Sequence, residues 1–178
     1  VGYFAGYGAQ GALCTAIGVE AGCNIQADIA TAVGYRAGYT NQGNSATALG
    51  REAGHNNQGV QSTAVGYHAG INSQGAYCTG VGQQGGANSQ GQYGTAVGYQ
   101  AGMNVQGQHS VAVGREAALN AQGASAVAIG NSAGQNSQSA SSVAIGDNSG
   151  RQTQSGSAVA IGNHAGSNAQ GGFCVGIG

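Results

Sequence analysis

A glutamine returns every sixteen residues along the chain and is the most regular side chain that could do chemistry. A primary amide both donates and accepts hydrogen bonds, so identical amides stacked along one axis can bond donor to acceptor in a ladder. We expect a structural ladder that holds neighbouring repeats in register, with a ligand-binding row of amides as the alternative. The members of this Gln row are Gln10, Gln26, Gln42, Gln58, Gln74, Gln90, Gln106, Gln122, Gln138, Gln154 and Gln170.

Tyrosines occupy one position in alternate repeats and are the best candidates for a contact surface. This Tyr row consists of Tyr3, Tyr35, Tyr67 and Tyr99. An aromatic ring on an outward turn can stack on a sugar or fill a pocket of a partner protein. Arg51, Gln83 and Arg115 fill the intervening positions. They favour a solvated turn, in which Arg supports Tyr through cation–π contacts, so a purely structural row is the other interpretation.

Charged side chains are too few to indicate catalysis. Only 5% of the residues are charged, and the net charge is −1. Glu20, Arg36, Glu52 and His68 fill one position of four successive repeats, where opposite charges attract weakly and set register. The chain lacks the cluster of acids that general acid–base catalysis on a β-helix needs. It also lacks a basic field that could hold nucleic acid. We therefore expect no enzyme activity and no nucleic-acid partner.

Cysteine and histidine spacing does not indicate a metal site. Cys14, Cys78 and Cys174 share one position of the repeat but lie four and six repeats apart. At one strand spacing per repeat these separations are about 19 and 29 Å, too far for a disulfide or a shared zinc ion. The four histidines occupy three different positions, and two aspartates are too few for a calcium-binding β-roll. We expect no metal and no cofactor, and small buried or interfacial roles for all the cysteines.

These rows can line up only if each sixteen-residue repeat completes one turn of backbone. A Val-Gly, Ile-Gly or Leu-Gly pair keeps the same step from Val1 to Ile177 without an insertion, so every repeat occupies an equivalent place in a stack. Residues 46–50 alternate small and larger side chains, as a strand does. A second extended stretch is predicted over Asn-x-Gln segments such as 72–74, with glycines at the turns.

The many glycines and the scarcity of Glu, Lys and Arg argue against helices. The sequence therefore predicts an all-β parallel β-solenoid with two short strands per sixteen-residue coil. Residues 1–178 form a single array of eleven repeats followed by one further Ile-Gly start. Because the array begins and ends on a repeat boundary, we expect it to be a fragment of a longer chain. No apolar run reaches the length of a membrane span.

The first predicted strand has two different faces. Ala46, Ala48 and Gly50 share a small face, and Thr47 and Leu49 share a larger one. We expect the larger face to fill the interior of each coil, because apolar burial drives folding. We expect the small face to let another chain approach closely and to form an oligomer interface.

Two phrases of the sequence resemble a known family. Residues 110–114 (Ser-Val-Ala-Val-Gly) and 142–146 (Ser-Val-Ala-Ile-Gly) resemble the head repeats of trimeric autotransporter adhesins, the YadA-like head. Residues 31–38 and 95–102 are similar to repeats of phage and algal-virus fibre proteins. The resemblance covers the whole chain and implies a left-handed β-roll, three chains around one axis, and display outside a cell or virion. The period departs from the family's, which is about fourteen residues.

Together these patterns predict a structural or adhesive extracellular fibre segment that spaces or presents a binding surface. Its expected partners are itself, as a homotrimer or filament, and surface glycans or a host-cell surface protein. A self-assembling extracellular filament, growing through open strand edges, is one alternative. An ice-binding solenoid is another, because six repeats carry threonine at one position, from Thr15 to Thr95. Valine replaces this threonine from Val111 to Val175, which favours a core-facing position over an ice-binding one.

Overall fold

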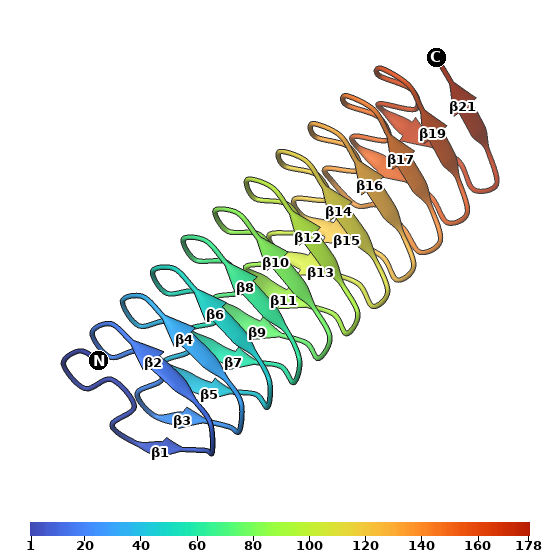
Figure 1. The fold of residues 1–178 in the computed structure, drawn as a ribbon. Coiled ribbons are helices and arrows are strands. Elements are labelled where there is room, and N and C mark those ends of the chain that lie inside the picture. Colours follow the sequence, from blue (N-terminus) through green and yellow to red (C-terminus); the bar gives the residue numbers. More distant parts are fainter.

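Each coil contributes one strand to a long parallel sheet, and every coil except the one around Gln138 contributes a second strand to an opposite row of parallel strands, as the computed structural model of residues 1–178 shows (Figure 1). The long sheet contains eleven strands: β2 (Thr15–Ile17), β4 (Thr31–Val33), β6 (Thr47–Leu49), β8 (Thr63–Val65), β10 (Thr79–Val81), β12 (Thr95–Val97), β14 (Val111–Val113), β16 (Val127–Ile129), β17 (Val143–Ile145), β19 (Val159–Ile161) and β21 (Val175–Ile177). The prediction of an all-β parallel solenoid is confirmed.

The second sheet is formed by the Asn-x-Gln segments. Eight of its strands are continuous: β1 (Ala9–Gln10), β3 (Ile25–Gln26), β5 (Thr40–Gln42), β7 (Asn56–Gln58), β9 (Asn72–Gln74), β11 (Asn88–Gln90), β13 (Val105–Gln106) and β15 (Ala121–Gln122). The pair β18 (Thr153–Gln154) and β20 (Ala169–Gln170) continues the same row, joined to it by bridges through Gln138. We call this row of strands the Gln sheet.

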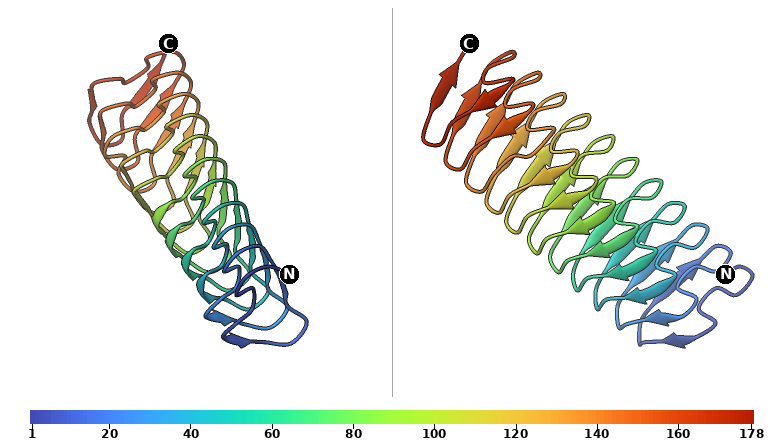
Figure 2. Two further views of the ribbon diagram at one scale, coloured as in Figure 1. Left: turned by 90° about the vertical axis from the view of Figure 1, so that its left-hand side faces the viewer. Right: turned by 180° about the vertical axis from the view of Figure 1, so that it is seen from behind.

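The strand register confirms a coil of sixteen residues. Thr47 pairs with Thr63 and Leu49 with Val65 in the long sheet, and Gln42 pairs with Gln58 in the Gln sheet. Every residue therefore lies beside its equivalent in the next coil. The result is a rod whose two termini lie at opposite ends and whose two sheets face each other across a narrow interior (Figure 2).

The two faces of the long sheet are the reverse of our expectation. Ala46 and Ala48 point into the coil and are fully buried, whereas Leu49 is 45% exposed. The small face is therefore the core and not an oligomer interface. The physical reason is the width of the coil, because the interior already holds a glutamine side chain from the opposite sheet. Only small side chains fit beside that amide at the density of a protein core, and the position of Ala46 is filled in other coils by Ser62, Cys78, Ser110 and Ser142, which are also buried.

Glycine is required where successive coils turn away from the long sheet. Gly34 has φ of +133°, a conformation that L residues with side chains rarely adopt. A Cβ atom at this residue would lie 2.4 Å from the carbonyl oxygen of Gly50 in the next coil. The backbones of neighbouring coils touch here, and this contact explains the invariant second residue of each Val-Gly or Ile-Gly pair.

Candidate functional surfaces

The Gln row lies inside the coil and joins the two sheets. The side-chain amide nitrogen of Gln42 lies 2.7 Å from the carbonyl oxygen of Thr31 and 3.3 Å from that of Ala46, and it donates to both. It also donates to the side-chain oxygen of Gln58 in the next coil, at 3.1 Å. A polar side chain is tolerated in this core because its donors meet acceptors.

The bond from the Gln row to the long sheet recurs in every coil from Gln26 to Gln170, at 2.7–3.0 Å. Amide-to-amide bonds join six of the successive pairs: Gln10–Gln26, Gln42–Gln58, Gln74–Gln90, Gln122–Gln138, Gln138–Gln154 and Gln154–Gln170. All members except Gln10 are buried. A ligand at the surface cannot reach these amides, which argues for the structural interpretation over the ligand-binding one.

The turn before each Gln sheet strand leaves room for the amide. Gly38 has φ of +53°, and a Cβ atom on it would lie 2.6 Å from the side-chain oxygen of Gln42. One coil departs from this rule, because Ala118 occupies the equivalent position with φ of 49° and is fully buried beside Gln122. A left-handed alanine is costly, by about 1–2 kcal/mol.

Asparagines on the outer face of the Gln sheet form a second set of side-chain bonds. Asn56 donates to Asn72 at 3.0 Å, and Asn72 donates to Asn88 at 2.9 Å. Asn104 donates to Asn120 at 2.8 Å. Unlike the Gln row, none of these side chains is buried: Asn72 and Asn120 are exposed and the others are half-buried, so water competes for the same donors and acceptors.

The Tyr row lies on the turn that follows the long sheet. Tyr35 and Tyr67 are each 40% exposed, Tyr99 is 43% exposed and Tyr3 is 68% exposed. The guanidinium carbon of Arg51 lies 5.7 Å from the ring centre of Tyr35 and 5.5 Å from that of Tyr67. Arginine therefore separates two tyrosines in a cation–π stack, and the ring edges remain open to a partner.

Next to the Tyr row, charged side chains of adjacent coils form ion pairs. The guanidinium of Arg36 donates to the carboxylate of Glu20 at 2.5 Å, which raises the Arg36 pKa above its usual value. His68 lies 2.7 Å from the carboxylate of Glu52. Such partly solvated pairs contribute little to stability and carry no catalytic geometry.

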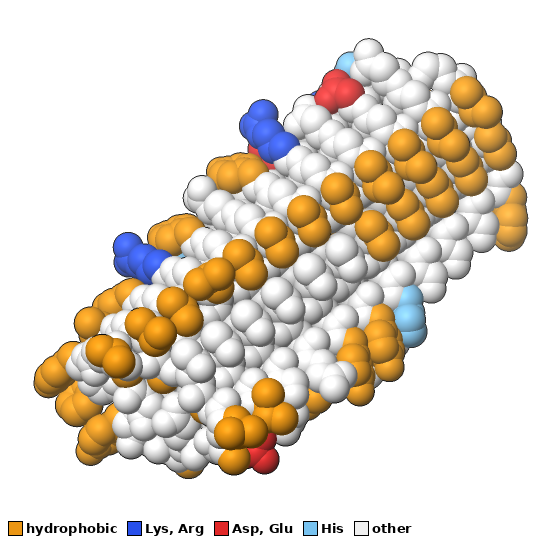
Figure 3. Space-filling model, viewed as in Figure 1, with side chains coloured by type: hydrophobic (Ala, Val, Ile, Leu, Met, Phe, Trp, Pro, Cys, Tyr) orange, Lys and Arg blue, Asp and Glu red, His pale blue; other side chains and the backbone are white.

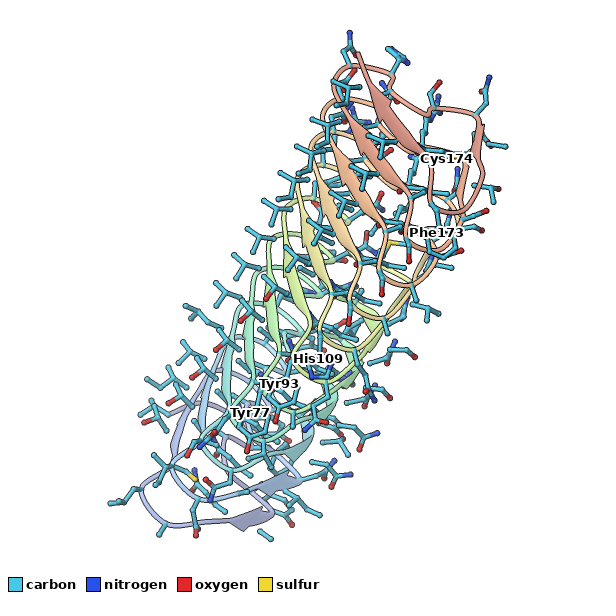
Figure 4. The ribbon with its side chains drawn as sticks, turned by 90° about the vertical axis from the view of Figure 1, so that its right-hand side faces the viewer. Tyr77, Tyr93, His109, Phe173 and Cys174 are labelled. Atoms are coloured by element: carbon cyan, nitrogen blue, oxygen red, sulfur yellow. The ribbon has the colours of Figure 1, made fainter.

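A second aromatic row escaped the sequence analysis. Tyr77, Tyr93 and His109 occupy one turn position in three successive coils, and their rings stack with centroids 5.0 Å apart (Figure 4). The interplanar angles are 8° and 17°. The signal in the sequence is the spacing of sixteen residues between Tyr77, Tyr93 and His109.

The largest feature that the sequence analysis missed is the outer face of the long sheet. Two rows of side chains, which we call the long-sheet face, run along the rod (Figure 3). The Thr/Val row contains Thr15, Thr31, Thr47, Thr63, Thr79, Thr95, Val111, Val127, Val143, Val159 and Val175. The Val/Ile row contains Ile17, Val33, Leu49, Val65, Val81, Val97, Val113, Ile129, Ile145, Ile161 and Ile177. None of these side chains is buried, and none is charged.

The remaining candidate groups are isolated. No three His, Cys, Asp or Glu side chains gather as a metal ion would require, and the surface has no pocket. All four cysteines are free thiols. Cys78 is buried, and burial raises the pKa of its thiol. Cys23 is also buried, Cys14 is half-buried and Cys174 is exposed, so the coil itself buries two of the four thiols.

The structure contains no helix that is long and apolar enough to span a membrane. In comparisons with known proteins, no family model, curated protein or solved structure matches the chain. What the chain does must therefore be argued from its two aromatic rows and from the long-sheet face.

Proposed function

We propose that this solenoid is a segment of a structural or adhesive fibre, displayed outside a cell or virion, in which copies of the chain associate through the long-sheet face. The observation that carries the proposal is an uninterrupted row of apolar or threonine side chains, all half-buried or exposed, on the outside of all eleven strands of that sheet. Large contiguous apolar surfaces on soluble proteins usually mark an interface.

The partner that best fits this face is a second copy of the chain. The side chains repeat once per coil, so a surface with the same period can meet them at every coil. At about 4.8 Å per strand the face is roughly 50 Å long, and two rows make it about 10 Å wide or slightly more. The area is about 500–800 Å² per partner, close to the roughly 800 Å² of a standard interface.

The composition of the Thr/Val row favours parallel, in-register packing. Threonine occupies the row up to Thr95 and valine from Val111 onward. Antiparallel packing would bury threonine hydroxyls against valine methyl groups, at about 1–3 kcal/mol for each hydroxyl left without a partner. Parallel packing places threonine beside threonine, where hydroxyls can bond to one another.

The resemblance to YadA-like heads supports three chains around one axis and a left-handed coil as the specific form of this assembly. In that arrangement the long-sheet faces meet at the axis. The Tyr row lies on a turn outside the face, so half-exposed rings such as Tyr35 and Tyr67 remain available to surface glycans or a host-cell surface protein.

Analytical ultracentrifugation of wild-type protein and two valine variants tests this proposal. We expect a trimer for the wild type and a monomer for Val127→Asp, in which a charge enters the long-sheet face. The matched control is Val105→Asp, because Val105 is 55% exposed on the outer face of β13 in the Gln sheet. Circular dichroism checks that each variant keeps its β-structure. A folded wild-type monomer at micromolar concentration, or equal dissociation of both variants, contradicts the proposal.

One observation favours ice binding as a second candidate function. The sequence predicts that the Thr/Val row faces the core, which argues against ice binding, but the row lies on the outside of a regular sheet. A flat grid of hydroxyl and methyl groups is one way to order water. Thermal hysteresis from a monomeric protein, abolished by Thr63→Tyr in the middle of the row, would support this function. A trimer without thermal hysteresis would exclude it in favour of the fibre.

A further inference from the structure

Tyr77 and Tyr93 bring two phenol rings face to face in adjacent coils. Their centroids are 5.0 Å apart, their planes differ by 8°, and each residue is 46% exposed (Figure 4). His109 covers the other face of Tyr93 at 5.0 Å. Both tyrosines lie on a turn between the sheets, where a ring can tilt without moving a strand.

Among the eight tyrosines, only Tyr77 and Tyr93 have rings that stack on each other. Tyr35 and Tyr67 share a position but lie two coils apart, and Arg51 lies between them. At the N-terminal end, Phe4 contacts both Tyr3 and Tyr7, with ring centroids at 4.2 and 4.8 Å. The register of the coils therefore selects Tyr77 and Tyr93 for any reaction that needs two adjacent phenols.

We propose that Tyr77 and Tyr93 are a site of oxidative crosslinking, at which a peroxidase with hydrogen peroxide joins two coils as a dityrosine. Each phenol loses one electron and its hydroxyl proton to become a phenoxyl radical. The two radicals form a carbon–carbon bond between ring carbons ortho to the oxygens. The hydrogen on each ortho carbon then moves to its oxygen and restores the phenol. The two electrons and two protons removed reduce one hydrogen peroxide to two waters.

Two physical arguments favour this coupling within one chain. Holding the rings in adjacent coils makes the coupling step effectively unimolecular, so it outpaces encounters between chains in dilute solution. Half-exposed phenols are also accessible to an oxidant that cannot enter the narrow core. The new bond closes a loop of sixteen residues and restricts the unfolded chain, so it should raise the melting temperature.

Peroxidase treatment of dilute wild-type protein, followed by mass spectrometry, tests the assignment. We expect dityrosine fluorescence and a monomeric chain lighter by two hydrogen atoms. Trypsin cleaves after arginine, so the expected bond stays within the peptide 52–115. A bond between Tyr35 and Tyr67 would instead join the peptide 1–36 to 52–115, which distinguishes the two pairs.

The variant Tyr93→Phe keeps an aromatic ring in the stack but removes the phenol, and it should lose the fluorescence, the mass change and the rise in melting temperature. Tyr99→Phe is the matched control and should retain all three. Free N-acetyltyrosine in the same reaction verifies that the oxidant works. The proposal is overturned if the oxidant couples free tyrosine but not the protein, if Tyr93→Phe forms as much dityrosine as the wild type, or if the bonds lie between chains.

Discussion

The interior of the coil and the long-sheet face invert the usual distribution of polar and apolar side chains. Inside, amides of the Gln row are buried among alanines; outside, valines and isoleucines are half-buried or exposed. The interior can be polar because each amide from Gln26 onward bonds to a carbonyl of the long sheet. The difference teaches that hydrogen bonding of the amide donors and the available width decide what a thin solenoid buries, whereas hydrophobicity alone does not.

Of the predicted changes, removing one interior amide should lower the free energy of unfolding the most. Gln74→Ala deletes bonds to the carbonyl of Thr63 and to the side chain of Gln90, both at 3.0 Å, and leaves a cavity. We expect the free energy of unfolding to fall by about 2–4 kcal/mol, measured by urea denaturation. Asn72→Ala, on the exposed side of the same strand, is the control and should cost about 0.5 kcal/mol or less. Equal losses would show that the interior amides are not special.

Threonine, introduced at an inward and at an outward position of the same strand, should lower stability only at the inward one. Ala128→Thr adds two heavy atoms to a fully buried core position on β16, and overpacking of this kind costs about 1–3 kcal/mol. Its neighbour Val127 points outward, and Val127→Thr should change the unfolding free energy of the separated chain by about 0.5 kcal/mol or less. Thermal melts under dissociating conditions provide the measurement. A greater loss in Val127→Thr would mean that the faces are assigned the wrong way round.

Substitutions in the turn that makes room for each amide should change stability less, and in opposite directions at Gly134 and Ala118. Gly134→Ala places a Cβ atom 2.6 Å from the side-chain oxygen of Gln138 and should cost about 1–2 kcal/mol. Ala118→Gly relieves the left-handed alanine at the equivalent position and should stabilise the protein by up to about 1 kcal/mol. Calorimetry should give melting temperatures shifted in opposite directions. Destabilisation by Ala118→Gly would refute the steric account of this turn.

The smallest expected effect concerns thiol reactivity at one position of the repeat. Burial raises the pKa of the Cys78 thiol, so at pH 8 less of it is thiolate than in an ordinary cysteine. Cys78 should therefore react with a maleimide more slowly than the exposed Cys174, which lies six coils further along. Peptide mapping of the labelled chain gives both rates. Equal rates would indicate that the coil around Cys78 opens readily.

Much of the fold could be predicted because the sequence repeats with one period. The strict return of glutamine and of the Val-Gly step predicts which residues pair, as Gln42 with Gln58 and Leu49 with Val65. The stacking of Tyr77 on Tyr93 follows from the same rule. The assignment of inside and outside could not be predicted, because alternation along Ala46, Thr47, Ala48 and Leu49 defines two faces without saying which is buried.

By itself, the sequence determined the parallel stack of sixteen-residue coils, because only that arrangement brings each residue to its equivalent without an insertion. The tertiary structure decided that alanine and glutamine line the core and that valine, isoleucine and threonine form the outer surface. The reason is the small cross-section of the coil: a glutamine that spans it to reach a carbonyl on the far sheet leaves space only for side chains as small as those of alanine, serine and cysteine.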